Sequence, residues 1–419
     1  MSTPLQTRWT AGEVLGVGRF RAFLTVYVLD VAADAMWLVT VGWVAAGAPN
    51  SIYTGVVLAA GSIPHVFFLF RGGLRADRIG SGALLRRTMP VRLALLLLWA
   101  AIATSTVGTW RLLAVLAVTF AIGAVAGYHD PAMLKYPTEL LPREGRASAL
   151  KVERLSTRFA QAAGAFAGGW LLGTGGVSAA SLVGAGLLVT TVVILARLAR
   201  QPGKTTVATA AEDSSIGQGL GYVRRHRILR WTITSQGIVN LISAAAIMAI
   251  LPLKARHAGW DASAYGGSFG AYGIGITLGT AGTLRLTRLS TRAGLLIGLG
   301  GAVISSGAVV AIGFANTQML TSISALIMGL SIGPVGPMLG GFTREEVPDT
   351  LIGRVMSVVS AVTGGIEPIG ALIVGGVAAI VTIDQTAQIL GGLSTAACAA
   401  CLVAVWRNSR EAVAQETSD

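Results

Sequence analysis

The stretch GGLRADRIG, residues 72–80, returns 210 residues later as GTLRLTRLS, residues 282–290. Other signals recur at nearly the same offset: Pro131 and Pro142 return as Pro337 and Pro348, Gly145-Arg146 as Gly353-Arg354, and Gly168-Gly169 as Gly375-Gly376. One shared offset predicts two structurally similar halves. Because the segments between these signals are mostly apolar, the sequence predicts two membrane bundles packed face to face, an arrangement typical of secondary transporters.

The composition predicts an integral membrane protein. Of the 419 residues, 53% are hydrophobic and 12% are charged, whereas about a quarter are charged in a soluble domain. Apolar runs of about 20 residues, long enough to cross a bilayer as helices, recur along the chain: 20–46, 52–71, 89–108, 111–131, 148–172, 176–197, 231–253, 263–284, 292–313, 317–341, 352–380 and 385–406. The expected fold class is all-α, with twelve transmembrane helices in two pseudo-symmetric six-helix bundles.

The expected domains are an N-terminal six-helix bundle at 1–200, a cytoplasmic linker with an amphipathic segment at 201–230, and a C-terminal six-helix bundle at 231–419. The amphipathic segment is expected at Gly219–Arg230. The spans leave no room for a globular extramembrane domain, and the sequence has no Walker A pattern. The energy for transport is therefore expected to come from an ion gradient or from the substrate's own gradient.

The net charge of +13 is explained by topology. With the N-terminus in the cytoplasm, 29 of the 32 Lys and Arg residues fall on the cytoplasmic side, six of them in a loop at 71–92 and six in a loop at 132–158. The other side receives Arg111, Lys254 and Arg256. This asymmetry predicts cytoplasmic termini and argues against nucleic acid binding. Arg outnumbers Lys 28 to 4, which is typical of a GC-rich bacterial genome and indicates a bacterial inner membrane.

Acidic residues inside apolar spans are the strongest functional pointers, because each costs about 2.5–3.5 kcal/mol at the helix centre. Asp30 and Asp34 lie four residues apart on one face of the first span, and Glu367 lies near the middle of the eleventh. Two neighbouring carboxylates disfavour double ionisation, so one of them is expected to bind a proton reversibly. Asp34, Asp30 and Glu367 are the predicted proton-coupling residues, although each could instead form a structural hydrogen bond between helices.

Three residues are candidates for a substrate cavity. Trp37, three residues after Asp34, could face a flat or lipophilic cation or could pack between helices. Asn240, 206 residues after Asp34, could bind substrate or join two helices. Tyr128 is the third candidate, and the neighbouring His129 is interpreted as structural.

The stretch 72–80 also resembles the loop signature of the major facilitator superfamily, G-x-x-x-D-R-x-G, expected here after the second span. The matching residues are Gly73, Asp77, Arg78 and Gly80, while Ser81 and Gly82 replace the usual basic pair. The resemblance implies that Asp77 meets the start of the eleventh helix at 353–355 and braces the outward-facing state. Asp77 and Arg354, with the rest of the signature, are therefore expected to form a conformational gate.

Two longer regions, 131–169 and 344–376, resemble the macrolide-efflux-like branch of this superfamily, which comprises twelve-helix drug:proton antiporters and related siderophore exporters. Ala165 replaces the usual proline of the fifth helix, and the usual arginine of the fourth helix is absent. The resemblance implies proton-coupled export of amphipathic drugs or antibiotics by alternating access. Export of an endogenous siderophore or lipid-like metabolite is an alternative, and a non-transporting scaffold or sensor is a second.

Glu153 stands among Lys151, Arg154 and Arg158, and this grouping predicts a cytoplasmic ion-pair gate. Cys398 and Cys401 lie within the last apolar span and are expected to be structural. No cofactor, metal or enzymatic activity is expected. The expected partners are a small amphipathic substrate, protons and membrane lipids, and the protein is expected to act as a monomer.

Overall fold

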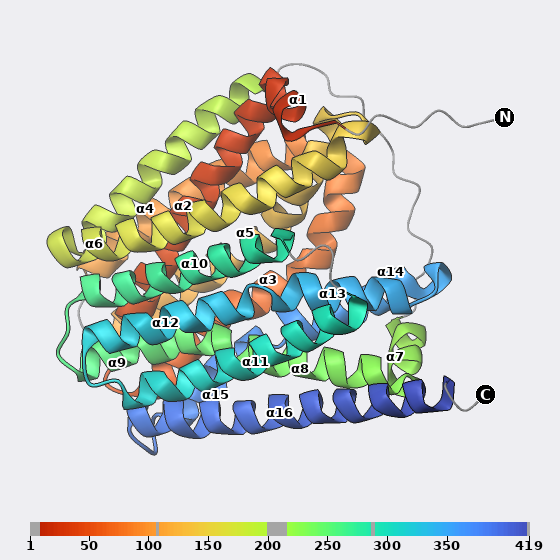
Figure 1. Cartoon of the computed structure of the whole chain (residues 1–419). Helices are drawn as coiled ribbons and strands as arrows, with labels where there is room; N and C mark the ends of the chain where they lie inside the picture. Colours follow the sequence, from red (N-terminus) through yellow and green to blue (C-terminus); the bar gives the residue numbers. More distant parts are fainter. Residues whose placement is uncertain (1–8, 106–108, 199–215, 286–289, 417–419) are drawn as a thin grey trace. The chain divides into compact units, whose positions relative to one another are not determined.

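Helices build the chain wherever its structure is described, at residues 9–105, 109–198, 216–285 and 290–416 of the computed structural model, and no strand occurs in those ranges (Figure 1). The helices are α1 (Ala11–Gly16), α2 (Gly18–Ala46), α3 (Ser51–Ile79), α4 (Ser81–Ser105), α5 (Thr109–Leu140), α6 (Arg143–Leu198), α7 (Ile216–Arg225), α8 (Arg227–Ala245), η1 (Ala246–Ile250), α9 (Leu251–His257), α10 (Ala262–Arg285), α11 (Thr291–Phe314), α12 (Gln318–Ile332), α13 (Val335–Glu346), α14 (Asp349–Gly364), α15 (Glu367–Val377) and α16 (Ile383–Glu416).

The chain divides into two compact units. Unit 1 comprises Met1–Val44 with Ala60–Ala210, and unit 2 comprises Ala45–Ala59 with Ala211–Asp419. In unit 1, α4 packs against α5 and α6; in unit 2, α10 packs against α12, and α11 packs against α16. Each unit has its own apolar core, which includes Phe23 and Leu85 in unit 1 and Leu299 and Leu339 in unit 2.

Nine stretches within the described residues are long and apolar enough to cross a membrane. One of them, Glu144–Leu198, provides two passes, because α6 consists of two arms that meet at Gly176, whose φ of +70° ends the first arm (Figure 1). Two further helices, α4 and α10, are 25 and 24 residues long. They are less apolar because α4 carries three arginines and α10 is rich in Gly, Ser and Thr. The expected fold of twelve transmembrane helices is confirmed.

The expected loop at 71–92 is not a loop. Residues 72–79 continue α3, and only Gly80, with a φ of +83°, interrupts the helix before α4 begins at Ser81. The prediction was wrong because it ended the second span at the last run of apolar side chains, whereas the helix continues by two more turns with polar ones. Arg86 and Arg87 are exposed on α4, but Arg92 is buried within it. Of the second copy of the repeat, residues 286–289 lie outside the described residues.

The amphipathic segment expected at Gly219–Arg230 ends earlier in the structure. Much of 201–218 lies outside the described residues, and the amphipathic segment is α7, which ends at Arg225. His226 then caps α8 by accepting from the Leu229 N–H, so Arg227 and Arg230 belong to the following helix rather than to the surface segment. Gly219 holds α7 directly against the backbone of Arg354 on α14.

Close contacts between glycines pack α3 against α5. A Cβ atom added to Gly123 would overlap the Gly61 carbonyl group, and one added to Gly127 would meet the His65 carbonyl oxygen at 2.7 Å. Gly72 faces the backbone of Gly127 in the same way. The two helix axes can approach this closely only because no side chain separates them.

Replacing Gly123 by alanine is therefore expected to destabilise the protein by about 1–3 kcal/mol, since overpacking forces the two backbones apart. The thermal unfolding temperature of the purified protein in detergent would report the loss. Gly73→Ala on α3 is the matched control, because nothing lies within 4 Å of its added Cβ. An equal unfolding temperature for the two variants would contradict the glycine packing.

Candidate functional site

Two carboxylates lie one turn apart on α2. Asp30 and Asp34 share a face of the helix, since residues i and i+4 are neighbours on a helix surface. The Asp30 side chain is 4% exposed, whereas the Asp34 side chain is 41% exposed. Asp30 is therefore the enclosed member of the pair, and Asp34 is the accessible one.

One buried guanidinium joins the two carboxylates. Arg92 on α4 donates from Nη1 to Asp30 Oδ1 at 2.7 Å and from Nη2 to Asp34 Oδ1. Its side chain is only 4% exposed. A charge at this depth needs an opposite charge beside it, and Arg92 and Asp30 provide this for each other. A second contact between the same helices, from Trp99 Nε1 to Thr40 Oγ1 at 3.1 Å, helps to fix α4 against α2.

The second carboxylate oxygen of Asp30 faces a buried histidine. His129 Nε2 lies 3.0 Å from Asp30 Oδ2, and the His129 side chain is 1% exposed. On the other side of the ring, His129 Nδ1 lies 3.0 Å from Thr88 Oγ1. The Thr88 hydroxyl is also 3.2 Å from the Leu84 carbonyl oxygen.

This arrangement accommodates a neutral or a protonated imidazole. When His129 is neutral and its Nε2–H donates to Asp30, the Thr88 hydroxyl can donate to Nδ1. When His129 carries both protons, Nδ1–H can donate to Thr88, whose hydroxyl then donates to the Leu84 carbonyl. Rotation of one hydroxyl group therefore lets Thr88 either donate to the ring or accept from it without leaving a polar atom unpaired.

A second histidine–carboxylate pair lies beside the first. Asp130 follows His129 on α5, and Asp130 Oδ2 lies 3.0 Å from His65 Nε2 on α3. The His65 and Asp130 side chains are 35% and 42% exposed. The close glycine packing of α3 and α5 brings these two side chains together. Asp130 is also close enough to Arg92 to interact with it electrostatically.

The charges of this cluster do not balance. We call it the Arg92 cluster and define it by Asp30, Asp34, Arg92, His129 and Asp130. Three carboxylates share one guanidinium, so the cluster has two excess negative charges when its carboxylates are ionised and its imidazole is neutral. In a low-dielectric setting that excess favours binding of protons or of another cation. In the part of the chain that the structure describes, no three His, Cys, Asp or Glu side chains are grouped to hold a metal ion.

Comparison with protein families identifies the fold. The family model of the Major Facilitator Superfamily matches residues 17–371, which is most of the chain. This chain belongs to the major facilitator superfamily. It is therefore a membrane transporter and not an enzyme.

Three members of known name are similar to this chain at low sequence identity. The uncharacterized MFS-type transporter YkuC of Bacillus subtilis (strain 168) is 23% identical over 317 residues, which cover 72% of each chain. The nucleoside transporter NupG superposes with a TM-score of 0.73 at 15% identity and covers 92% of this chain and 99% of its own. The POT family transporter PepTSo superposes with a TM-score of 0.68 at 11% identity, over 94% and 99% of the two chains. These structures share the superfamily fold with this chain.

The predicted substrate residues occupy different places in the superfamily fold. Trp37 lies on α2 one turn after Asp34, and its indole nitrogen is buried without a hydrogen-bond partner among the described residues. Tyr128 stacks on Phe68 at a ring-centroid distance of 5.4 Å. Asn240 is in unit 2, where its Nδ2 donates to the Gln236 carbonyl of the preceding turn at 2.7 Å. Of the three, Trp37 is the one that follows directly on the Arg92 cluster along the same helix.

Glu367, the third predicted proton-coupling residue, is not on a continuous helix. The eleventh span is interrupted at 365–366, and Glu367 is the first residue of α15, followed by Pro368. Proline cannot donate the hydrogen bond that would continue α14. The Glu367 side chain is exposed and belongs to unit 2, whereas the Arg92 cluster belongs to unit 1.

The predicted gate residues have local partners within their own units. Asp77 forms an ion pair with Lys135 on α5 at 2.5 Å. Arg354, in the second turn of α14 rather than in a turn before it, donates to Gln218 on α7. The roles of Gly73, Arg78 and Gly80 in gating, like those of Asp77 and Arg354, stay predictions.

Glu153 lies in a different setting from the one predicted. It is only 2% exposed, and within unit 1 it forms no ion pair at salt-bridge distance among the described residues. Arg154 acts on it electrostatically, and the Tyr27 hydroxyl is close enough to interact with it. Of the other basic neighbours, Arg158 donates from Nη1 to Gln161 Oε1 at 3.3 Å, and Lys151 is exposed.

Sequence reasoning missed the most connected residue of the site. Arg92 was counted with the basic residues of a cytoplasmic loop at 71–92, although the expected span at 89–108 already included it. Since α4 begins at Ser81, Arg92 lies eleven residues inside the helix, about 16 Å from its start. An arginine in an apolar run, two residues after Pro90, was the available signal.

Proposed function

We propose that this superfamily member is a proton-coupled exporter of small amphipathic compounds, preferably cations, and that Asp34 is its principal proton acceptor. The observation that carries the proposal is the excess of carboxylates over cations in the Arg92 cluster. A proton and a cationic substrate can each neutralise the same excess charge, so that binding of one weakens binding of the other. Such coupling is typically worth about 1–3 kcal/mol.

The steps follow from the chemistry of the cluster. With the site open to the outside, Asp34 takes up a proton, and its hydrogen bond to Arg92 weakens because a neutral carboxyl no longer attracts the guanidinium. Arg92 then interacts mainly with Asp30, and the affinity for a cation falls. With the site open to the cytoplasm, loss of the proton restores the negative charge, and the next substrate binds. Alternating exposure of one site to the two sides completes the cycle.

The surroundings of Asp34 support an amphipathic cation over an anion. Trp37 offers an aromatic surface one turn away, and ring faces attract cations. Its buried indole N–H has no partner among the described residues and can donate to an acceptor on the substrate. An anionic siderophore would meet excess negative charge here, which disfavours that alternative. Antibiotics with a basic amine fit the site better.

The direction of transport and the topology belong to the same proposal. The strong Lys and Arg asymmetry of the sequence supports cytoplasmic termini in a bacterial inner membrane. Because Arg92 is buried in α4, it no longer counts among the basic residues on the cytoplasmic side. The other basic residues still place most of the Lys and Arg on that side. Export is supported by the resemblance of the 131–169 and 344–376 regions to drug:proton antiporters.

Transport into proteoliposomes tests the proposal. Purified protein would be reconstituted, a pH gradient imposed, and uptake measured for lipophilic cations, basic antibiotics, an anionic siderophore, nucleosides and a dipeptide. We expect accumulation of lipophilic cations or basic antibiotics that disappears when the gradient is collapsed. Gradient-driven transport of only anions, nucleosides or dipeptides would contradict the proposed substrate class, and transport insensitive to the gradient would contradict proton coupling.

A further inference from the structure

A second acidic group is buried in unit 1 outside the Arg92 cluster. Glu153, on the first arm of α6, is 2% exposed. Among the described residues of unit 1, the Tyr27 hydroxyl is close enough to interact with this carboxylate, and no guanidinium or ammonium group lies at salt-bridge distance from it. An ionised carboxylate in such a place is costly unless it is paired. A group of this kind is suited to carrying a proton for part of a cycle.

Tyr27 connects Glu153 to the Arg92 cluster. Tyr27, Asp30 and Asp34 are spaced by three and four residues on α2, so that their side chains form one stripe along the helix. The Tyr27 hydroxyl interacts with Glu153 and Thr157 on α6, and Asp30 and Asp130 are close enough to act on it electrostatically. On the far side, the Tyr27 ring stacks on Phe23 at a centroid distance of 5.8 Å.

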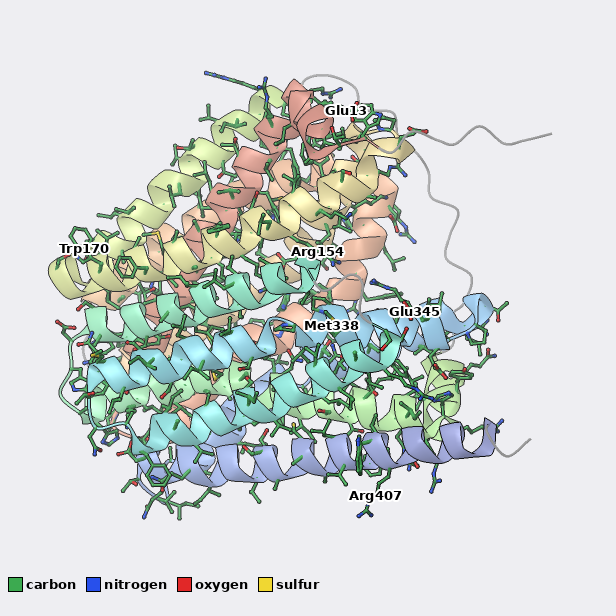
Figure 2. The ribbon with its side chains drawn as sticks, in the orientation of Figure 1. Glu13, Arg154, Trp170, Met338, Glu345 and Arg407 are labelled. Carbon is green, nitrogen blue, oxygen red and sulfur yellow. The ribbon has the colours of Figure 1, made fainter. Side chains whose placement is uncertain are left out.

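Close backbone packing fixes the two helices that carry these side chains. A Cβ added to Gly164 would overlap the backbone of Ala32, and one added to Gly168 would meet Met36 Cα at 2.8 Å. Glu153, Gly164 and Gly168 lie on nearly the same face of α6, since they are eleven and fifteen residues apart. The first arm of α6 begins at Arg143 and ends at Gly176, and Figure 2 labels two of its residues, Arg154 and Trp170. The glycine contacts thus fix the first arm of α6, which carries Glu153, against α2, which carries Tyr27.

We infer that Tyr27 and Glu153 form a second proton station, through which the Arg92 cluster exchanges protons with the aqueous phase at the end of unit 1 where α6 begins. This inference rests on the proposed proton coupling and adds a route to it. In the proposed topology that end faces the cytoplasm. Glu153 is then the residue that receives the proton before it leaves the protein, and Tyr27 is the positioning and relay residue between the two sites.

Each O–H bond that breaks in the transfer is matched by one that forms. The O–H bond of a protonated carboxyl in the cluster breaks as its proton passes to Tyr27 Oη, while the Tyr27 O–H bond breaks and its proton passes to the Glu153 carboxylate. Tyr27 ends the step as a neutral hydroxyl, Glu153 becomes a neutral carboxyl, and the cluster regains a negative charge. Glu153 then loses its proton to water. Arg154, next in sequence, favours the resulting carboxylate.

Two assays on reconstituted full-length protein separate this route from substrate binding. The first measures transport driven by a pH gradient, and the second measures counterflow, in which labelled and unlabelled substrate exchange without net proton movement. We expect Glu153→Gln to reduce gradient-driven transport by about tenfold or more while counterflow stays within about twofold of wild type. We expect Tyr27→Phe to slow gradient-driven transport in the same selective way. The matched controls are Glu144→Gln in the first turn of α6 and Tyr136→Phe, a buried tyrosine on α5.

The outcomes distinguish the route from the proposed function. If the wild-type protein shows no response to the gradient, the proposed function itself has failed. If the wild type responds and Glu153→Gln responds equally, the second station does not exist. Loss of counterflow and gradient-driven transport together in a folded Glu153→Gln protein would also overturn it, because the residue would then serve substrate binding. If that variant does not fold, Tyr27→Phe decides between the same outcomes.

Discussion

Replacing Arg92 by glutamine is expected to destabilise the protein by about 3–5 kcal/mol, because removing one partner leaves the other charge buried and unpaired. Asp30 is that charge, with 4% of its side chain exposed and its main electrostatic partner removed. Gradient-driven transport is expected to be lost as well, because Asp34 loses the group that responds to its protonation. Thermal unfolding in detergent and transport in proteoliposomes measure the two effects.

A matched control and a rescue make the Arg92 prediction specific. Arg87→Gln removes an exposed arginine from the same helix and is expected to change stability little. The double variant Arg92→Gln with Asp30→Asn removes both members of the buried pair, so it should recover much of the lost stability without recovering transport. If Arg92→Gln unfolds at the wild-type temperature, the pairing in the Arg92 cluster is wrong.

Replacing Asp34 by asparagine is expected to abolish proton coupling while the fold is retained. Asparagine keeps a hydrogen-bond acceptor for Arg92, and Asp30 still pairs with the guanidinium, so the cost in stability should be no more than about 1 kcal/mol. Substrate binding should lose its pH dependence, a coupling typically of about 5–150-fold in affinity, and gradient-driven transport should be lost. Binding measured between pH 5 and pH 8, together with uptake assays, would show both changes.

Asp261→Asn is the matched control for this substitution. Asp261 lies in the loop before α10, outside the membrane-spanning helices, and accepts hydrogen bonds from Ser263 Oγ at 2.6 Å and from the Ala264 N–H at 3.0 Å. These hydrogen bonds lower the pKa of Asp261, so it is ionised throughout the pH range of the assay. Asparagine can accept the same bonds there, and transport should be unchanged. An Asp34→Asn protein with wild-type pH dependence would assign proton binding to another residue.

The fold could be predicted from the sequence because its signals are long and repeated. Twelve apolar runs and one shared repeat offset were enough for the helix number and the fold class. The helix ends were less predictable, because polar residues continue several helices beyond the apolar part of the span. Residues 72–79 were interpreted as a loop for that reason, although only Gly80 leaves the helical conformation. The break before Glu367 coincides with Gly364, Gly365 and Pro368 in the sequence.

The site was predicted in part. The spacing of Asp30 and Asp34 indicated one face of one helix, and the structure places both on one guanidinium. The partners came from other helices: Arg92 from α4, His129 and Asp130 from α5, and His65 from α3. Sequence spacing carries no information on such contacts. His129 was interpreted as structural, two residues before the expected end of the fourth span at 131, whereas α5 continues to Leu140.

Substrate-induced proton release from purified protein tests most directly whether the excess carboxylates of the Arg92 cluster exchange protons for substrate. In weakly buffered detergent solution with a pH indicator, adding a transported lipophilic cation to the wild type should release protons in proportion to the substrate bound. Asp34→Asn should bind the compound more weakly and, at saturating concentration, without that release, and Asp261→Asn should behave as wild type. Binding of the cation to the wild type with no proton release at any pH between 5 and 8 would contradict the account.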